Sequence, residues 1–328
     1  MVSLNPLATS EFKVDRVLVF DQPSWSPLYV KRTFSLAHAL EAEMIAPDAR
    51  VMYFELNGTV FVFQTLHLAF HHVVQGDFNG QPWMVSFCVV CNAGAAFNPL
   101  VNGMVYHFAG NAMYNAMTLL VDDETKSFWN HLTGECLHGT LKGAQLEGYG
   151  VLSPATAKEA LETYPDAQLI FSQLNKRELI EAEADYRFAI SEPKDAVLSD
   201  MLIKTLDARE DTRLPRLDMG LGVWTGETAR YYPYTRLNVH NNALIDVIDG
   251  RRLVVYVDPV NANPGAFYTD AYRATWRGTD LNLGTGDMYR GGLLHTATGA
   301  DAPERPKQMF VRWYAFAFTF PGCDIFAG

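Results

Sequence analysis

The sequence has few of the features that mark secreted, membrane-spanning or disulfide-stabilised proteins. It contains only four cysteines in 328 residues, which is too few for a disulfide framework. No apolar run approaches the roughly 18 residues that cross a bilayer. The first residues lack the basic and apolar segments of a signal peptide. We therefore expect a protein of a reducing compartment, the cytoplasm, with no membrane partner.

Basic residues are also scarce. The chain has 26 Lys and Arg against 37 Asp and Glu, a formal net charge of -11, and no cluster of five or more basic residues. Because nucleic acids are bound through a positive surface, we expect no nucleic-acid partner and predict a small-molecule or thiol substrate instead. The hydrophobic fraction of 48% is typical of a globular protein. No pattern in the sequence indicates an oligomeric state.

What the sequence does contain is a series of tight-turn signals between short apolar or alternating runs. Asn-Gly and Asp-Gly pairs readily adopt the positive φ angles that two-residue hairpin turns need. They predict a mostly β (α+β) fold of antiparallel sheets with a few peripheral helices. The four pairs are Asn57-Gly58, Asn79-Gly80, Asn102-Gly103 and Asp249-Gly250.

Helical patterns are fewer. Residues 35–45 have helical periodicity, and residues 174–188 form a charged amphipathic segment. Ser153 and Pro154 are suited to cap and start a helix that continues to Thr163. We predict these three helices. The charged helix at residues 174–188 is placed in a linker between the two halves of the chain.

The two halves resemble each other at a shift of roughly 170 residues, which is typical of an internal duplication. Residues 79–87 align with 249–257, and Asp258 then falls opposite Cys88 and Asn261 opposite Cys91. We interpret the halves as two diverged copies of one antiparallel β-rich unit, and any thiol chemistry as a property of the first copy. The predicted organisation is an N-terminal segment (1–47), a first copy with the thiol site (48–172), a helical linker (173–212) and a second, degenerate copy (213–328).

Cys88 and Cys91 are the main candidates for a functional site. Two cysteines separated by two residues can close a disulfide, chelate a soft metal ion, or stabilise one thiolate near neutral pH. The pair follows an apolar run and precedes Asn92 and several small residues, so we expect it at a strand end, where scaffolds often present reactive groups. The competing interpretation is two inert cysteines packed as small hydrophobic side chains.

Two further groups of side chains could contribute. Residues 67–72 contain three histidines, and imidazole together with thiolate suits zinc or copper(I). The competing interpretation of each histidine is a hydrogen-bonded, half-buried ring. Cys136 is a candidate resolving thiol or third ligand, with simple packing as the alternative, and we expect Cys323 to be structural. A closed structural zinc site needs four ligands, and the sequence has no second cysteine pair.

From about Asp48 to the C terminus the chain resembles the domain of unknown function 3179 family. Members of that family show a His-containing segment, Gly-x-Pro, an apolar strand and Cys-Pro-Leu-Cys-Asn. A glycine, an Asp-x-x-Thr-x-Ser-x-Trp segment and a Thr/Leu-Gly turn follow. Val89 stands where the family has proline. The matching positions are 71–74, 80–82, 84–87, 88–92, Gly110, 122–129 and 133–134.

The resemblance implies a role for His71, which matches the family's histidine, and it adds Asn92 and Trp129 as possible further site residues. Some relatives resemble selenoproteins with selenocysteine in the cysteine pair. Such a replacement favours redox or soft-metal chemistry over packing. A family of unknown function locates a site and does not supply a reaction.

Three functions fit these observations, in the following order. The first is a thiol oxidoreductase or peroxide-reducing enzyme, in which Cys88 attacks, Cys91 resolves the product and His71 acts as base. The second is a copper or zinc site formed by Cys88, Cys91 and His71, either in a binding protein or in a lyase that cleaves organometal bonds. The third is a non-enzymatic scaffold with buried cysteines.

Overall fold

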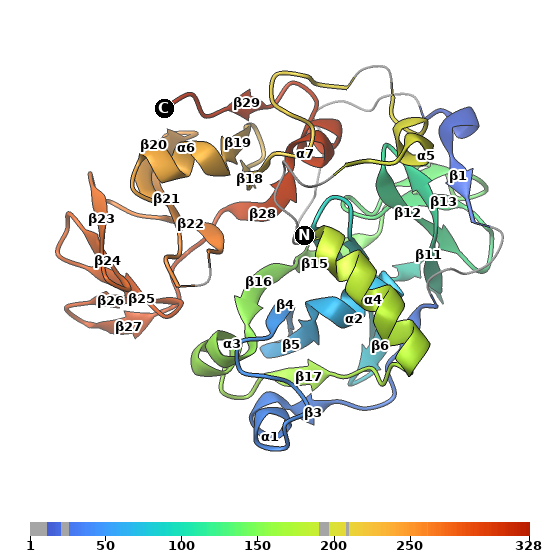
Figure 1. The fold of residues 1–328 in the computed structure, drawn as a ribbon, viewed down its shortest axis with the longest axis horizontal. Coiled ribbons are helices and arrows are strands. Elements are labelled where there is room, and N and C mark those ends of the chain that lie inside the picture. Colours follow the sequence, from blue (N-terminus) through green and yellow to red (C-terminus); the bar gives the residue numbers. More distant parts are fainter. Residues whose placement is uncertain (1–11, 21–25, 190–196, 208–209, 261) are drawn as a thin grey trace.

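Figure 1 shows the computed structural model, which describes residues 12–20, 26–189, 197–207, 210–260 and 262–328. Strands dominate, and most helices span two turns or fewer. The predicted mostly β fold with a few helices is therefore confirmed. Within the described residues, no helix is both long and apolar enough to span a bilayer.

The first half of the chain forms three five-stranded sheets and one small hairpin. The sheet ordered β16-β4-β5-β17-β3 contains β3 (Phe34–Ser35), β4 (Arg50–Leu56), β5 (Thr59–Gln64), β16 (Ser153–Thr156) and β17 (Gln168–Ile170). The sheet ordered β15-β8-β7-β6-β2 contains β2 (Leu28–Tyr29), β6 (Val73–Phe78), β7 (Gln81–Cys88), β8 (Ala93–Asn98) and β15 (Glu147–Val151). The sheet ordered β1-β11-β12-β13-β14 contains β1 (Leu18–Val19), β11 (Phe108–Tyr114), β12 (Met117–Asp122), β13 (Phe128–Asn130) and β14 (Cys136–His138). The hairpin pairs β9 (Leu100–Val101) with β10 (Met104–Val105).

The described part of the second half adds three sheets, of four, three and five strands. The sheet ordered β28-β18-β19-β29 contains β18 (Met219–Trp224), β19 (Ala229–Pro233), β28 (Lys307–Arg312) and β29 (Asp324–Ile325). A three-stranded sheet contains β20 (Ala243–Ile248), β21 (Arg251–Val257) and β22 (Pro264–Tyr268). The outermost sheet contains β23 (Ala274–Arg277), β24 (Asp280–Leu283), β25 (Met288–Arg290), β26 (Leu293–Thr296) and β27 (Gly299–Asp301).

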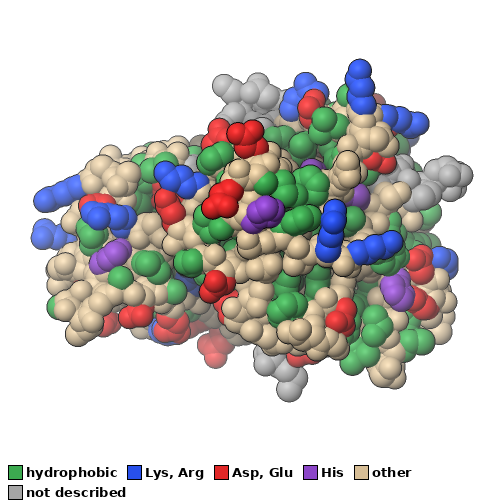
Figure 2. Space-filling view, turned by 90° about the horizontal axis from the view of Figure 1, so that it is seen from below, with side chains coloured by type: hydrophobic (Ala, Val, Ile, Leu, Met, Phe, Trp, Pro, Cys, Tyr) green, Lys and Arg blue, Asp and Glu red, His purple; other side chains and the backbone are tan. Residues whose placement is uncertain are grey.

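The helices lie between these strands and against their faces. They are a 3-10 turn at Val14–Arg16, α1 (Leu36–Glu41), α2 (Thr65–His71), α3 (Ala157–Thr163), α4 (Lys176–Ala189), α5 (Asp200–Ile203), α6 (Tyr234–Val239) and α7 (Trp313–Thr319). Figure 1 shows α4 running across the first half beside α2. On the face in Figure 2, acidic and basic side chains are interspersed among the described residues, without a broad patch of either sign.

All four predicted turns join neighbouring antiparallel strands. They lie between β4 and β5, β6 and β7, β9 and β10, and β20 and β21. In each pair both residues have positive φ, for example 52° at Asn57 and 79° at Gly58. This is the backbone geometry that matches the right-handed twist of the flanking strands. The residues of each turn therefore determine the register of its hairpin.

The three predicted helices are present, and two of them differ at a boundary. The first, α1, ends at Glu41, four residues before the predicted end at residue 45. The Ser35 side chain caps α1 by accepting the His38 N–H. The helix expected to start at Ser153-Pro154 begins only at Ala157, where Thr156 and Glu159 form a capping box. Pro154 instead lies in β16, which is an edge strand. A proline is tolerated there because its missing N–H faces no partner strand.

The two halves share an order of elements. In the first half, β16-β4-β5-β17 has β17 parallel to β5, and in the second half β28-β18-β19-β29 has β29 parallel to β19. A short helix and a three-stranded antiparallel meander follow the central hairpin in both, β6-β7-β8 and β20-β21-β22. This order is consistent with the predicted repeat, and the duplication itself stays a prediction. Asn261, the predicted counterpart of Cys91, lies outside the described residues.

The largest hydrophobic cluster contains residues from both halves. It includes Cys88, Cys91 and Trp129 of the first half together with Tyr231 and Trp313 of the second, each 0% exposed. Because these side chains exclude water together, the thiol pair lies in a core to which both halves contribute.

Residues 220–226 are rich in glycine, and their spacing is not that of a dinucleotide-binding fingerprint. Close packing between a strand and a helix explains one of these glycines. A Cβ atom on Gly222 would overlap the Phe316 ring of α7. We expect Gly222→Ala to lower the free energy of unfolding by about 3 kcal/mol, because a packed core yields poorly to added volume. Gly226→Ala is the control, since nothing lies within 4 Å of its added Cβ. Denaturant unfolding that gives equal stabilities for the two variants would contradict this packing.

Candidate thiol site

The thiol pair lies in the turn that joins β7 to β8. Cys88 is the last residue of β7 and pairs with Ala93, the first residue of β8. Asn92 has a φ of 54°, a left-handed conformation that asparagine tolerates better than most residues. Its N–H donates to the Val89 carbonyl at 3.3 Å. Asn92 therefore closes the turn that presents the two sulfur atoms to the same side.

Two backbone N–H groups point at the sulfur of Cys88. The N–H of Cys91 lies 3.3 Å from Cys88 Sγ, and the N–H of Thr118, on β12 of the neighbouring sheet, lies 3.5 Å from it. The Cys91 thiol is directed at the Cys88 carbonyl oxygen, 3.7 Å away. Donors arranged in this way stabilise a thiolate more than a neutral thiol.

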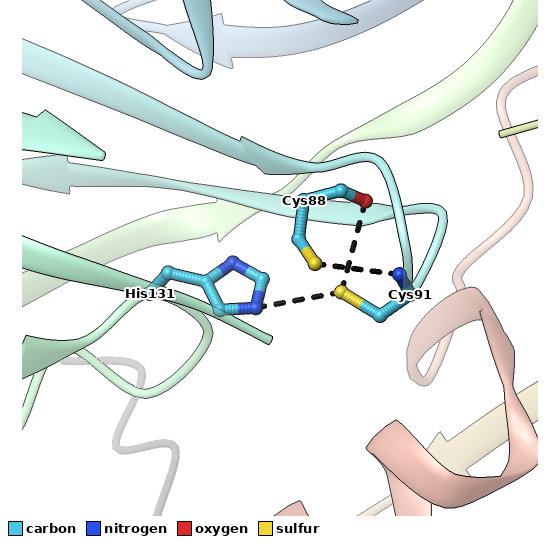
Figure 3. Close-up of side chains that lie close together, drawn as sticks. All are labelled: Cys88, Cys91 and His131. Atoms are coloured by element: carbon cyan, nitrogen blue, oxygen red, sulfur yellow. Dashed lines mark hydrogen bonds between the residues drawn. The ribbon is translucent and has the colours of Figure 1, made fainter. Parts of the chain in front are cut away.

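His131 completes the group. It follows β13, and Figure 3 shows its ring pointing at the cysteine pair from outside the β7–β8 hairpin. Its Nε2 lies 3.5 Å from Cys91 Sγ, and the two sulfur atoms and a ring nitrogen all lie within 4.8 Å of one another. The His131 carbonyl accepts a hydrogen bond of 2.7 Å from the Ser86 hydroxyl on β7. This bond ties the His131 loop to the strand that ends in Cys88.

The surroundings of the two thiols shift their pKa values in opposite directions. Burial opposes ionisation of Cys88, yet the Cys91 side chain, His131 and the Thr118 N–H together hold its pKa well below the usual value. Burial and the neighbouring Cys88 hold the pKa of Cys91 well above its usual value. Cys88 is therefore the more acidic of the two thiols, and Cys91 is the one that holds its proton more tightly.

Residues of the second half close the site on one side. The backbone N–H of Arg312, at the end of β28, donates to the Cys91 carbonyl at 3.1 Å. The Tyr314 hydroxyl donates to the Ala116 carbonyl at 2.9 Å. Burial lowers the pKa of the Arg312 guanidinium, while Cys91 and Cys88 act in the opposite direction. A buried positive charge thus lies within electrostatic reach of the thiols.

A small cavity borders the site on another side. Its volume is about 70 Å³, and its lining includes Thr118, His131 and Glu135. Burial raises the pKa of the Glu135 carboxyl. Both cysteine side chains are 0% exposed, and the cavity reaches Thr118 and His131, which contact the two sulfur atoms.

The His71 ring is hydrogen-bonded to residues outside the thiol group. Its Nδ1 lies 2.6 Å from the Ser26 carbonyl oxygen and its Nε2 lies 2.6 Å from Ser172 Oγ. A carbonyl can only accept, so Nδ1 carries the proton and Nε2 accepts from the serine hydroxyl. Burial lowers the pKa of His71, which favours this neutral form. His71 is not a member of the group formed by Cys88, Cys91 and His131, and its predicted role stays a prediction.

Of the neighbouring histidines, His72 is buried and His67 is half-buried. Burial lowers the pKa of His67 and of His72 to about 4. The charge of Cys88 acts on His72 in the opposite direction, which places His72 near the thiol pair. Both rings are therefore neutral at physiological pH.

Cys136 and Trp129 form a pair across β13 and β14. The Cys136 thiol donates to the His138 carbonyl, with 3.5 Å between sulfur and oxygen, and burial raises its pKa to about 11. Trp129 Nε1 donates to Asp122 Oδ2 at 2.8 Å. Cys323 is likewise buried, and burial raises its pKa to about 12. Among the described residues, neither Cys136 nor Cys323 belongs to the group of Cys88, Cys91 and His131, whereas Trp129 packs in the same hydrophobic cluster as the thiol pair.

The Asp-x-x-Thr-x-Ser-x-Trp segment is a buried hydrogen-bond network. The Asp122 carboxylate is 0% exposed and accepts from the Thr125 hydroxyl and from the N–H groups of Thr125 and Ser127, besides the Trp129 indole. This network shapes the β12–β13 connection and the position of Trp129, two residues before His131. That proximity was the available signal for His131, which the sequence analysis missed.

Comparison with known proteins places this site in a family. Comparison with curated proteins and with solved structures found no match. The family model described as "Protein of unknown function (DUF3179)" matches residues 31–321, which include Cys88, Cys91, His131 and the second-half residues that enclose them. The chain therefore belongs to the DUF3179 family of proteins of unknown function.

Proposed function

We propose that the protein reduces a small peroxide through its thiol pair, with Cys88 as the nucleophile and Cys91 as the resolving thiol. The observation that carries the proposal is the pair of backbone N–H groups, from Cys91 and Thr118, that point at Cys88 Sγ. Such donors keep the sulfur ionised in the resting protein. Thiolates are the form of cysteine that attacks peroxides and disulfides.

The enclosure of the site supports a small oxidant over a protein disulfide. The two cysteine side chains are fully buried, and the lining of the adjacent cavity of about 70 Å³ includes His131 and Thr118. A volume of this size admits a few water-sized molecules, and hydrogen peroxide is little larger than water. A folded protein substrate would have to open the shared core to reach the sulfur.

The reaction balances as follows. The Cys88 thiolate attacks one peroxide oxygen and the O–O bond breaks, which leaves a sulfenic acid on Cys88 and a hydroxide that is protonated from solvent. The Cys91 thiol passes its proton to His131 Nε2, and its sulfur attacks Cys88 Sγ. The S–OH bond breaks, and the hydroxide leaves as water with the proton from His131. The peroxide has gained the two electrons that the thiol pair lost.

His131 takes the role of base in this scheme because its Nε2 lies 3.5 Å from Cys91 Sγ, whereas both ring nitrogens of His71 bond to Ser26 and Ser172. A raised pKa on Cys91 makes such a base necessary. To complete a cycle, a low-molecular-weight thiol must reduce the Cys88–Cys91 disulfide by exchange.

A second candidate function is the binding of copper(I) or zinc, and the convergence of two thiols and one imidazole favours it. Two ligands bound to a tetrahedral metal at the usual zinc–sulfur and zinc–nitrogen lengths are about 3.6 Å apart. The separation between Cys91 Sγ and His131 Nε2 is 3.5 Å. Soft ligands of this kind suit copper(I) as well.

The two candidates are distinguished on freshly purified protein by metal analysis and by thiol titration before and after hydrogen peroxide is added, beside a Cys88→Ser/Cys91→Ser double variant. We expect metal-free protein in which one equivalent of peroxide consumes two thiols, reversibly on addition of a thiol reductant. Stoichiometric copper or zinc that is absent from the double variant would replace the peroxide proposal with the metal site. Metal-free protein whose thiols react only after denaturation would overturn both.

A further inference from the structure

A second cavity lies where the two halves of the chain meet, away from the thiol pair. Its volume is about 140 Å³, and β4, β16 and α3 of the first half face β21, β22 and β25 of the second across it. The Thr163 hydroxyl donates to the Gly291 carbonyl at 3.2 Å and links the two sides. Figure 1 shows β16 and α3 beside the second-half strands at this position. We call this cavity the inter-half cleft.

Among the residues that the structure describes, Arg305 is the one cationic side chain that lines the inter-half cleft, and it is exposed to solvent. Its Nη1 donates to the Tyr256 hydroxyl at 3.1 Å and to the Ala266 carbonyl at 3.2 Å, and its Nη2 donates to the Tyr289 hydroxyl at 2.8 Å. A guanidinium has five N–H donors. Nε–H and one Nη2–H therefore have no partner among the residues that the structure describes.

The tyrosines add another donor. The Tyr256 and Tyr289 hydroxyls are 2.7 Å apart. Tyr256 accepts from Arg305 and donates to Tyr289, which leaves the Tyr289 O–H free to donate into the cleft, because its oxygen already accepts from both neighbours. Gly265 makes this arrangement possible, since a Cβ there would lie 2.6 Å from the Tyr256 hydroxyl.

Arg305 forms no ion pair with a carboxylate within the described part of the chain. Two acidic residues line the cleft, Glu159 and Asp258. The Glu159 carboxylate accepts from the Thr156 N–H and hydroxyl, both at 2.9 Å, in the capping box of α3. Asp258 Oδ1 accepts from the Val260 N–H at 2.8 Å. The hydrogen-bond partners of Arg305 given above are all neutral, although the protein has a net charge of -11. The Arg305 guanidinium is therefore available to pair with an anionic ligand.

We propose that the inter-half cleft binds a small oxyanion, the carboxylate or phosphate group of a small molecule, with Arg305 as the anchor. The planar donor fork of arginine matches the two oxygens of such groups, and the Tyr289 hydroxyl supplies a further donor. The cleft is smaller than the roughly 300–1,000 Å³ of pockets for drug-sized ligands, which favours a short-chain acid or inorganic phosphate over a nucleotide. This site is independent of the peroxide chemistry proposed above.

Calorimetric titration of the full-length protein with inorganic phosphate and, separately, with succinate tests the proposal. We expect saturable binding of at least one of the two, and an increase in Kd of at least about tenfold in Arg305→Met, because the anchoring charge is lost. Binding of phosphate alone assigns a phosphorylated ligand, and binding of succinate alone assigns a carboxylate. Arg277→Met is the matched control, since Arg277 is exposed on β23 outside the cleft, and its affinity should equal that of the wild type.

Arg305→Lys provides a second variant that keeps the charge and loses the fork, and we expect it to weaken binding several-fold. If Arg305→Met does not fold, the proposal is tested by the titration of the wild type and of Arg305→Lys. The absence of saturable binding of both oxyanions by the wild type overturns the proposal. Equal affinity in the wild type and in every folded Arg305 variant overturns it as well.

Discussion

Cys88→Ser should slow peroxide reduction by at least about a thousandfold, because the serine hydroxyl does not ionise near neutral pH and the nucleophile is lost. Cys91→Ser should behave differently. It keeps the nucleophile, so one equivalent of peroxide is consumed in a single burst and the sulfenic acid accumulates on Cys88. Measuring peroxide consumption over time separates the two variants, and trapping the sulfenic acid with a dimedone-type probe identifies the intermediate.

Cys136→Ser is the matched control for both variants. Cys136 is also a free, buried thiol, but burial raises its pKa to about 11, so it stays protonated and unreactive at neutral pH. Its substitution should leave the rate unchanged. Full activity in Cys88→Ser, or a loss in Cys136→Ser equal to that in Cys88→Ser, would contradict the assignment of the nucleophile.

The pH dependence of the first step tests the same assignment from another direction. Despite burial, the Cys91 side chain, His131 and the Thr118 N–H lower the pKa of Cys88, so its thiolate forms at a lower pH than that of an ordinary cysteine. The rate of sulfenic acid formation should therefore be level through the neutral range and fall only as the pH drops through that lowered pKa. A rate that keeps rising in alkaline solution would instead indicate an ordinary or raised thiol pKa.

Asp122→Ala should lower the free energy of unfolding by about 4 kcal/mol, because it leaves several buried donors without an acceptor, at roughly 1–3 kcal/mol each. The donors are the indole N–H of Trp129, the backbone N–H of Ser127 and the backbone N–H and hydroxyl of Thr125. Denaturant unfolding measures the loss. A variant that is stable enough to purify should also show slower Cys91 chemistry, because His131 follows Trp129 by two residues.

Asp123→Ala is the control for this prediction, since it removes a carboxylate from the adjacent position. The Asp123 side chain is 50% exposed, and its partner Lys126 is 69% exposed. An ion pair this exposed contributes about 0–1 kcal/mol, so the variant should be nearly as stable as the wild type. Similar losses in both variants would mean that the buried network around Asp122 contributes little.

Local chemistry in the sequence accounts for much of the fold. The Asn-Gly and Asp-Gly pairs identified the hairpins because positive φ is a property of those residues themselves. Pro154 was assigned to a helix start, and it lies in an edge strand because pairing with β4 and the cap at Thr156 outweigh a generic preference. The pairing with β4 joins residues about a hundred positions apart in the chain, Pro154 and Met52.

The sequence by itself determined the strand-rich fold, its hairpins and the location of the Cys88 and Cys91 pair, because turn preference and spacing act within a few residues. Only the tertiary structure placed His131 against Cys91 and gave His71 partners of its own at Ser26 and Ser172. Only it brought the Arg312 N–H to the Cys91 carbonyl. The residues in each of these contacts lie 40 or more positions apart in the chain. Sheet pairing and core packing bring such segments together, so no local sequence pattern predicts the contacts.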